Sequence, residues 1–293
     1  MNQILKSFAF ILSILTGSYA EENNTSLNPK NFHSESGSFI LDKKDYAWII
    51  GSGALAIPAY IRYKDMPSTD LNDLNRNEIN AFDRPYAGVY SPSFALASDI
   101  LVLPFCALPL ALTSFDAWKD KQGIKPIFTD AVIFGEAMVI SSSLDLLVRS
   151  LQVHPRPFVY NSEVPKADRL AGEASGSFYS GHSSAAFLTA VYLSYTYPLR
   201  HPEFEHSTLL WTGSLATATT IAALRVSAGK HFPSDVIVGA IAGGFFGWLL
   251  PYLHWNSKSN NNPNNKSNTQ ENIPKLSMQI DANGIHPEWT FNF

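Results

Sequence analysis

The 293-residue sequence has little charge and a single cysteine. Charged residues make up 16% of the chain, and a net charge of −4 with an isoelectric point near 6.0 leaves no general basic surface. We therefore expect no nucleic-acid partner, and any anion site must be built locally from a few converging cations. The single cysteine, Cys106, excludes an intrachain disulfide, and its apolar surroundings predict a packing role.

Long hydrophobic runs are also lacking, although hydrophobic residues make up 45% of the chain. The uncharged apolar runs cover 46–61, 100–115 and 236–253, and none supplies the comfortable spanning length of roughly 20 residues. The apolar segment 127–150 contains Asp130, Glu136 and Asp145, which are costly in hydrocarbon unless they face other helices. We expect a body that is soluble or only contacts a membrane surface, with an integral membrane protein as the alternative.

The N-terminus has the features of an export signal. Lys6 precedes an apolar stretch, 7–16, and the small residues Ser18 and Ala20 follow it. This pattern predicts a signal peptide at 1–20, cleavage after Ala20, and a periplasmic protein. The alternative, a membrane anchor, is disfavoured because the apolar stretch is too short to span a bilayer.

The remaining chain divides into four parts. Residues 21–44 are polar, and residues 45–255 form a helical domain whose six apolar segments predict an all-α, six-helix bundle. Residues 256–273 are an Asn/Ser-rich linker that cannot bury enough apolar surface to fold. Residues 274–293 alternate around Asn283-Gly284, which predicts a hairpin or a tail packed on the body. The six expected helices are 45–62, 90–115, 127–150, 181–198, 206–224 and 234–253.

Three clusters of cations and histidines stand at ends of these expected helices, at 149–157, 179–182 and 225–235. In an antiparallel bundle, the end of the third helix, the start of the fourth and the junction of the fifth and sixth lie at the same end. We therefore expect the three clusters to converge. The candidate residues are Arg149, Arg156, Ser180, Gly181, His182, Arg225, His231 and Asp235.

This combination of residues suits phosphoryl transfer. Guanidinium groups hold phosphate oxygens through paired hydrogen bonds, and free N–H groups at a helix start add more. His231 and Asp235 are four residues apart, so the carboxylate can bond one imidazole nitrogen and leave the other as a nucleophile. His182 can protonate the departing oxygen. Each residue alone has a plainer interpretation as a surface cation, helix cap or ion pair, but their joint occurrence favours an active site.

The pattern R-x6-R-P, then S-G-H, then R-x5-H-x3-D resembles the three-part signature of the type 2 phosphatidic acid phosphatases. That family shares its core with bacterial class A acid phosphatases and vanadium haloperoxidases, and the resemblance covers about 129–253. It implies that the three arginines, Ser180 and Gly181 bind phosphate. It also implies that His182 is the general acid, His231 the nucleophile and Asp235 its orienting partner.

Three positions depart from the family pattern. Arg149 stands where lysine is common, Tyr179 replaces the usual proline, and Leu224 replaces the usual serine before Arg225. The first change keeps the charge, whereas the last removes one hydroxyl that could bond phosphate or a neighbour. We therefore expect the ionic chemistry to survive, with a rate or substrate preference that differs from typical members.

The resemblance predicts a metal-independent phosphatase that hydrolyses phosphate monoesters, with lipid phosphates favoured, through a phosphohistidine. The alternatives are a non-specific periplasmic acid phosphatase on soluble monoesters, a vanadate-dependent haloperoxidase and a non-catalytic phosphate or lipid binder. We expect no cofactor and no metal, because no zinc-type His/Cys spacing and no carboxylate cluster suited to two metals appear in the sequence.

The number of membrane crossings decides on which side of the membrane the candidate site would lie. A cleaved signal followed by six membrane spans would put the candidate site in the cytoplasm, whereas the resemblance implies an outward-facing site. This conflict favours an exported body without spans, and an odd number of spans would restore the outward orientation.

Overall fold

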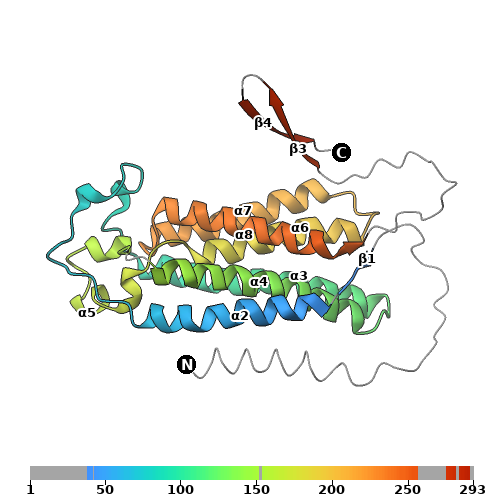
Figure 1. The fold of residues 1–293 in the computed structure, drawn as a ribbon, viewed down its shortest axis with the longest axis horizontal. Helices are drawn as coiled ribbons and strands as arrows, with labels where there is room; N and C mark the ends of the chain where they lie inside the picture. Colours follow the sequence, from blue (N-terminus) through green and yellow to red (C-terminus); the bar gives the residue numbers. More distant parts are fainter. Residues whose placement is uncertain (1–37, 42, 152–153, 257–274, 282–283, 291–293) are drawn as a thin grey trace. The chain divides into compact units, whose positions relative to one another are not determined.

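The computed structural model describes residues 38–41, 43–151, 154–256, 275–281 and 284–290. The described chain is mostly helical, and the long helices run side by side (Figure 1). They are α2 (Lys43–Lys64), α3 (Pro92–Lys119), α4 (Lys125–Leu151), α6 (Gly181–Arg200), α7 (Ser207–Ser227) and α8 (Pro233–His254). Each overlaps one of the segments expected to be helical, so the all-α prediction is confirmed. The predicted signal peptide lies outside the described residues, as does the predicted linker, 256–273, apart from Asn256, which belongs to β2.

Shorter elements connect the long helices. The α-helix α5 (Lys166–Arg169) brings the number of α-helices in the described residues to seven, one more than the predicted six. The 3-10 helices are η1 (Arg76–Glu78), η2 (Arg84–Tyr86), η3 (Pro157–Tyr160) and η4 (Gly172–Ser175). Strand β1 (Ser38–Phe39) pairs antiparallel with β2 (Trp255–Asn256), and β3 (Lys275–Asp281) pairs antiparallel with β4 (Gly284–Thr290).

Helix α6 lies at the centre of the bundle, because it contacts α3, α4, α7 and α8. One hydrophobic cluster joins it to α3 and α7 around Ala186, Ala190 and Ile221. A second joins it to α4 and α8 around Ile133 and Leu188, while α2 packs along α4. The start of α6 is therefore surrounded by the ends of its neighbours.

Three glycines of α8 set its distance from α6. A Cβ atom at Gly243 would lie 1.9 Å from the carbonyl oxygen of Ser184, and one at Gly247 would lie 2.4 Å from that of Leu188. Gly239 faces the carbonyl oxygen of Ser180 in the same way, at 2.5 Å. The four-residue glycine spacing thus lets the two backbones touch, which fixes the start of α8 beside the start of α6.

The three carboxylates of α4 face the interior of the bundle. Asp130 accepts hydrogen bonds from Thr113 and Tyr192 and pairs with Arg200. Asp145 pairs with Arg149 at 2.9 Å, and Glu136 lies 3.4 Å from the imidazole of His254. Their charge is therefore partnered within the protein and is not an argument against a membrane.

Within the described residues, four helices are long and apolar enough to cross a bilayer: α3, α4, α7 and α8. The expectation that no segment reaches spanning length is wrong, because the helices extend beyond the uncharged runs and α4 turns its carboxylates inward. Large apolar side chains also cover the outside of the bundle, among them Trp48, Leu103, Leu209, Ile241 and Leu253. An apolar exterior of this extent marks a membrane-associated protein.

Candidate active site

All the predicted site residues lie on or beside four helix ends that meet at one end of the bundle. Arg149 lies in the last turn of α4, Arg225 in the last turn of α7 and Asp235 in the first turn of α8. Ser180 is the N-cap of α6, and His231 lies in the short α7–α8 connection. The helix ends therefore meet in the structure, as the sequence predicts.

The start of α6 offers backbone N–H groups to the site. The side chain of Ser180 accepts a hydrogen bond from the Ser183 N–H at 3.3 Å, which caps the helix. The Ser180 N–H donates to the carbonyl of Asp235 at 3.1 Å, which ties α6 to α8. A Cβ atom at Gly181 would lie 2.9 Å from the Asp145 carboxylate, so a larger residue would push against the Arg149 pair.

The three arginines are buried and differ in how many partners they have. Arg149 donates from Nε to Asp145 at 2.9 Å and from Nη2 to the carbonyl of Tyr179 at 2.7 Å. Arg225 donates from Nη1 to Ser98 and to Asp99, each at 3.0 Å. The Nε atoms of Arg156 and Arg225 are buried and have no hydrogen-bond partner among the described residues. The cluster thus holds guanidinium donors that an oxyanion can satisfy.

His231 is almost fully buried, and its ring orientation is set by a backbone carbonyl. Its Nδ1 donates to the carbonyl oxygen of Ser177 at 2.7 Å, which leaves Nε2 as the unprotonated nitrogen of the neutral ring. Burial, and then the charges of Arg149, Arg156 and Arg225, hold the pKa of His231 well below its usual value. A neutral imidazole with an available lone pair is the form that can act as a nucleophile.

Asp235 supports His231 less directly than the sequence predicts. Its Oδ2 lies 3.8 Å from His231 Nδ1, beyond hydrogen-bond length, and instead accepts from Ser177 Oγ at 2.5 Å and from the Phe232 N–H at 2.8 Å. Ser177 in turn supplies the carbonyl that holds the imidazole. Asp235 therefore fixes the two segments that position His231, with Ser177 between them.

His182 bonds to a carboxylate that the sequence analysis did not single out. Its Nε2 lies 2.8 Å from Oδ1 of Asp99, and the same oxygen accepts from Arg225 at 3.0 Å. Burial and the charge of Arg225 lower the pKa of His182 to about 4, while the Asp99 carboxylate acts to raise it. Asp99 thus joins the candidate acid to a candidate phosphate ligand.

Charged groups of the separate motifs lie close enough to influence one another. The charges of Arg149, Arg156 and Arg225 all act on His231, and those of Arg149 and Arg225 act on His182. Burial and then the charge of Arg149 lower the pKa of Arg156. Mutual repulsion among buried cations makes the site receptive to an anion that neutralises them.

Several supporting residues were missed because they carry no motif. Asp83 caps α8 by accepting from the N–H and the hydroxyl of Ser234, at 3.0 and 2.5 Å. Gly229 adopts a φ of +71°, and a Cβ there would lie 1.8 Å from the carbonyl of Val89. Asp83 is close to the third motif only in space, whereas Gly229 lies within that motif and was missed because its positive φ is not evident from the residue pattern.

One other polar cluster has donor types suited to a metal. In the described part of the chain, Asp45, Glu136 and His254 place one ligand atom each within 4.8 Å of one another. His254 is the last residue of α8, whereas Asp235 lies in its first turn, so this cluster is at the far end of the helix from the arginines.

Residues 130–259 match the model of the PAP2 superfamily. The match covers 130 residues, less than half of the chain. The matched range contains every residue predicted for the site, so the proposed resemblance to this family is confirmed. Asp99 and Asp83 lie before the PAP2 match.

A crystal structure of a transmembrane PAP2 type phosphatidylglycerolphosphate phosphatase from Bacillus subtilis is similar to the chain. The two are 16% identical, with a TM-score of 0.43, and the match covers 72% of this chain and 96% of the other. The search of curated proteins gave no match.

Proposed function

We propose that this protein is a membrane-associated phosphatase that hydrolyses phosphate monoesters of lipids through a phosphohistidine. The observation that carries the proposal is the buried imidazole of His231, which is held by Ser177 and surrounded by three arginines. The match of residues 130–259 to the PAP2 superfamily model supports the same chemistry. The geometry suits a histidine nucleophile that faces bound phosphate. The proposed reaction uses no metal ligand.

In the proposed reaction, the phosphate dianion binds the guanidinium groups of Arg149, Arg156 and Arg225 and the N–H groups at the start of α6. Nε2 of His231 attacks phosphorus, an N–P bond forms, and the ester P–O bond breaks. His182 gives its proton to the departing alkoxide, which leaves as an alcohol. Water then attacks the phosphohistidine while His182 takes the proton from the water, and inorganic phosphate leaves.

The phosphate dianion also supplies a reason for His182 to be protonated when it is needed. In the free protein the pKa of His182 is lowered to about 4, first by burial and then by Arg225. A bound dianion beside the same ring favours the imidazolium, because an opposite charge nearby stabilises the protonated form. In this proposal, substrate binding is thus coupled to protonation of His182.

A lipid substrate is favoured by the exterior of the bundle. The four helices of spanning length place the arginine cluster at one end of an apolar body, where a membrane surface would present lipid headgroups. The aromatic side chains of Phe158 and Phe232, close to the motifs in sequence, are buried in hydrophobic clusters of the connecting segments. A soluble monoester remains the competing substrate class.

The experiment that tests the proposal is a phosphate-release panel on the full chain purified in detergent. We expect release from lipid phosphate monoesters in mixed micelles, with kcat/KM above that for short-chain soluble monoesters. Higher kcat/KM for the soluble esters would indicate the non-specific acid phosphatase. Added vanadate should inhibit; halide oxidation upon its addition would instead indicate a haloperoxidase.

The membrane face that carries the site can be tested on whole cells. With Cys106 replaced by serine, a cysteine introduced at the exposed Ser162 would sit in the connection beside the motifs. We propose an outward-facing site, so an impermeant maleimide should label this cysteine in intact cells. Labelling only after lysis would place the site in the cytoplasm and contradict export of the catalytic end.

A further inference from the structure

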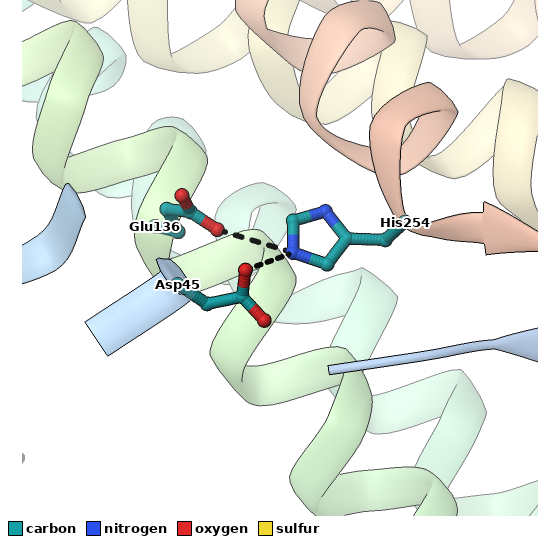
Figure 2. A group of neighbouring side chains, drawn as sticks. All are labelled: Asp45, Glu136 and His254. Carbon is teal, nitrogen blue, oxygen red and sulfur yellow. Dashed lines mark ion pairs between the residues drawn. The ribbon is translucent and has the colours of Figure 1, made fainter. Parts of the chain in front are cut away.

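The far end of α8 carries a second charged site, built by three helices. His254 ends α8, Asp45 lies in the first turn of α2, and Glu136 lies on α4. All three are buried, with exposed fractions of 8%, 6% and 1% in that order. Figure 2 shows both carboxylates directed at the same imidazole nitrogen.

The short β1–β2 pair brings these helices together. β1 precedes α2 and β2 follows α8, and the Ile40 N–H donates to the carbonyl of His254 at 3.0 Å. The rings of Phe39 and Trp255 pack edge to face, 4.9 Å apart. The last turn of α8 is thereby held against the start of α2, although the two lie about two hundred residues apart in the sequence, which is why spacing did not reveal the cluster.

The tautomer of His254 is suited to ligation. Its Nδ1 donates to the carbonyl of Leu250 at 2.7 Å, so the neutral ring presents the lone pair of Nε2 to the two carboxylates. Metal-bound histidines are commonly oriented in this way by a backbone carbonyl on the other nitrogen. Nε2 lies 3.2 Å from Oδ1 of Asp45 and 3.4 Å from Oε2 of Glu136.

Hydrogen bonding alone does not satisfy this arrangement. Glu136 Oε2 and His254 Nε2 are buried, yet neither takes part in a hydrogen bond of acceptable geometry within the described residues. These two buried atoms lie 3.4 Å apart, so a metal ion that accepts a lone pair from each would satisfy both.

We infer that Asp45, Glu136 and His254 bind a divalent metal ion, with Zn²⁺ as the ion that best fits. Carboxylate oxygens and a neutral imidazole nitrogen are donor types that Zn²⁺ binds. Donor atoms of a tetrahedral zinc site lie about 3.3 Å apart, given bonds of roughly 2.0–2.1 Å. The two Nε2–oxygen distances, 3.2 and 3.4 Å, agree with that spacing.

The surroundings leave room for a fourth ligand. A cavity of about 980 Å³ borders all three residues, and its other walls are mainly apolar side chains such as Trp48, Leu144 and Phe246. An apolar wall around a polar site strengthens ion–ligand attraction by keeping the local dielectric low. The metal would join α2, α4 and α8 and so stabilise the bundle; the arginine cluster does not need it for phosphoryl transfer.

The test uses the full chain in detergent, stripped with chelator and then equilibrated with micromolar Zn²⁺. We expect about one zinc per chain by elemental analysis after desalting and a higher thermal midpoint than in the stripped protein. Glu136→Gln and His254→Ala should each lower zinc affinity by at least about 100-fold, because loss of a ligand exceeds the 10- to 100-fold effect of outer-shell changes. Absence of zinc from wild-type protein, or full occupancy in Glu136→Gln, would overturn the inference.

Asp130→Asn is the matched control. Asp130 is also a buried acid of α4, but it is satisfied by Thr113, Tyr192 and Arg200 and lies outside the cluster. This variant should lose thermal stability and still bind one zinc; loss of zinc here too would mean that binding reports general folding, and would overturn the site.

Should the ligand variants not fold, Co²⁺ added to wild-type protein provides a second measurement. Strong visible absorption typical of four-coordinate cobalt supports the site, and a spectrum no stronger than that of the hydrated ion overturns it.

Discussion

At its first turn α8 places Asp235 near a histidine surrounded by arginines, whereas at its last residue it places His254 between two carboxylates. At the arginine end, Asp145, Asp99 and Asp235 are already bonded to protein partners, so guanidinium donors are in excess. At the other end, two carboxylates lie close to one imidazole nitrogen. The first end therefore suits an anion and the second a cation.

Helix dipoles act locally at both ends, where starts and ends of helices meet. The starts of α6 and α8 point positive partial charge at the Asp235 carboxylate and at the proposed phosphate position, while the ends of α4 and α7 carry arginines. The end of α8 points negative partial charge at His254, which favours a cation there. One antiparallel bundle thus provides two ion sites of opposite preference, and substitutions at one end should leave the other working.

The largest effect should come from His231→Ala. Without the buried imidazole no phosphohistidine can form, so turnover should fall by more than about 10⁴-fold on every substrate. Zinc stoichiometry should be unchanged, because His254 and its carboxylates lie at the other end of α8. Steady-state kinetics with acid-quench labelling measures the first part, and a label that persists in His231→Ala would contradict the assigned role.

A smaller and selective loss is expected for His182→Ala. An alkyl alkoxide leaves poorly without a proton, whereas nitrophenolate leaves well unaided. The variant should therefore lose about 10²- to 10⁴-fold on an alkyl phosphate and much less on nitrophenyl phosphate. Acid quench with labelled nitrophenyl phosphate should trap the phosphohistidine. Equal losses on both substrates would mean that His182 does not act as the acid.

Much of the arginine end could be predicted because motif and topology agree. Helix ends carry the residues, and short connections in an antiparallel bundle make those ends meet, so the sequence alone was enough to place Arg149, His182 and His231 together. The contact of Ser177 with His231 could not be foreseen, since it depends on a backbone carbonyl rather than on a side-chain type.

The far end could not be predicted at all, for a physical reason. Asp45, Glu136 and His254 come from three helices and follow no local spacing, and only the β1–β2 pairing and the packing of α2 on α4 bring them together. The membrane prediction failed in a related way. The charge within α4 argues against a bilayer only if it faces outward, and the packing that turns Asp130 and Glu136 inward is visible only in three dimensions.

Asp99→Asn should give a moderate, pH-dependent effect at the arginine end. The Asp99 carboxylate raises the pKa of His182, so its neutralisation should lower that pKa. Because the proton donor is lost as pH rises through this pKa, the falling limb of kcat/KM should move to lower pH. Asp116→Asn, on the same helix but paired with His201, is the control and should leave the profile in place. A limb that moves to higher pH in Asp99→Asn would contradict the coupling of Asp99 to His182.

The smallest effect on rate should come from chelator, and it separates the two ends most sharply. The arginines supply the charge stabilisation that a metal gives elsewhere, so the initial rate on a lipid phosphate at 25 °C should change by less than about twofold. Removal of zinc from the far end should nevertheless lower the thermal midpoint, since three helices lose a shared ligand. Arg156→Lys is the complementary variant: it should reduce the rate through loss of the planar guanidinium while zinc content stays the same. Abolition of activity by chelator with rescue by Mg²⁺ would show that phosphoryl transfer itself depends on a metal, because in that case the guanidinium groups around His231 would not be sufficient to carry the charge of the transferring phosphoryl group.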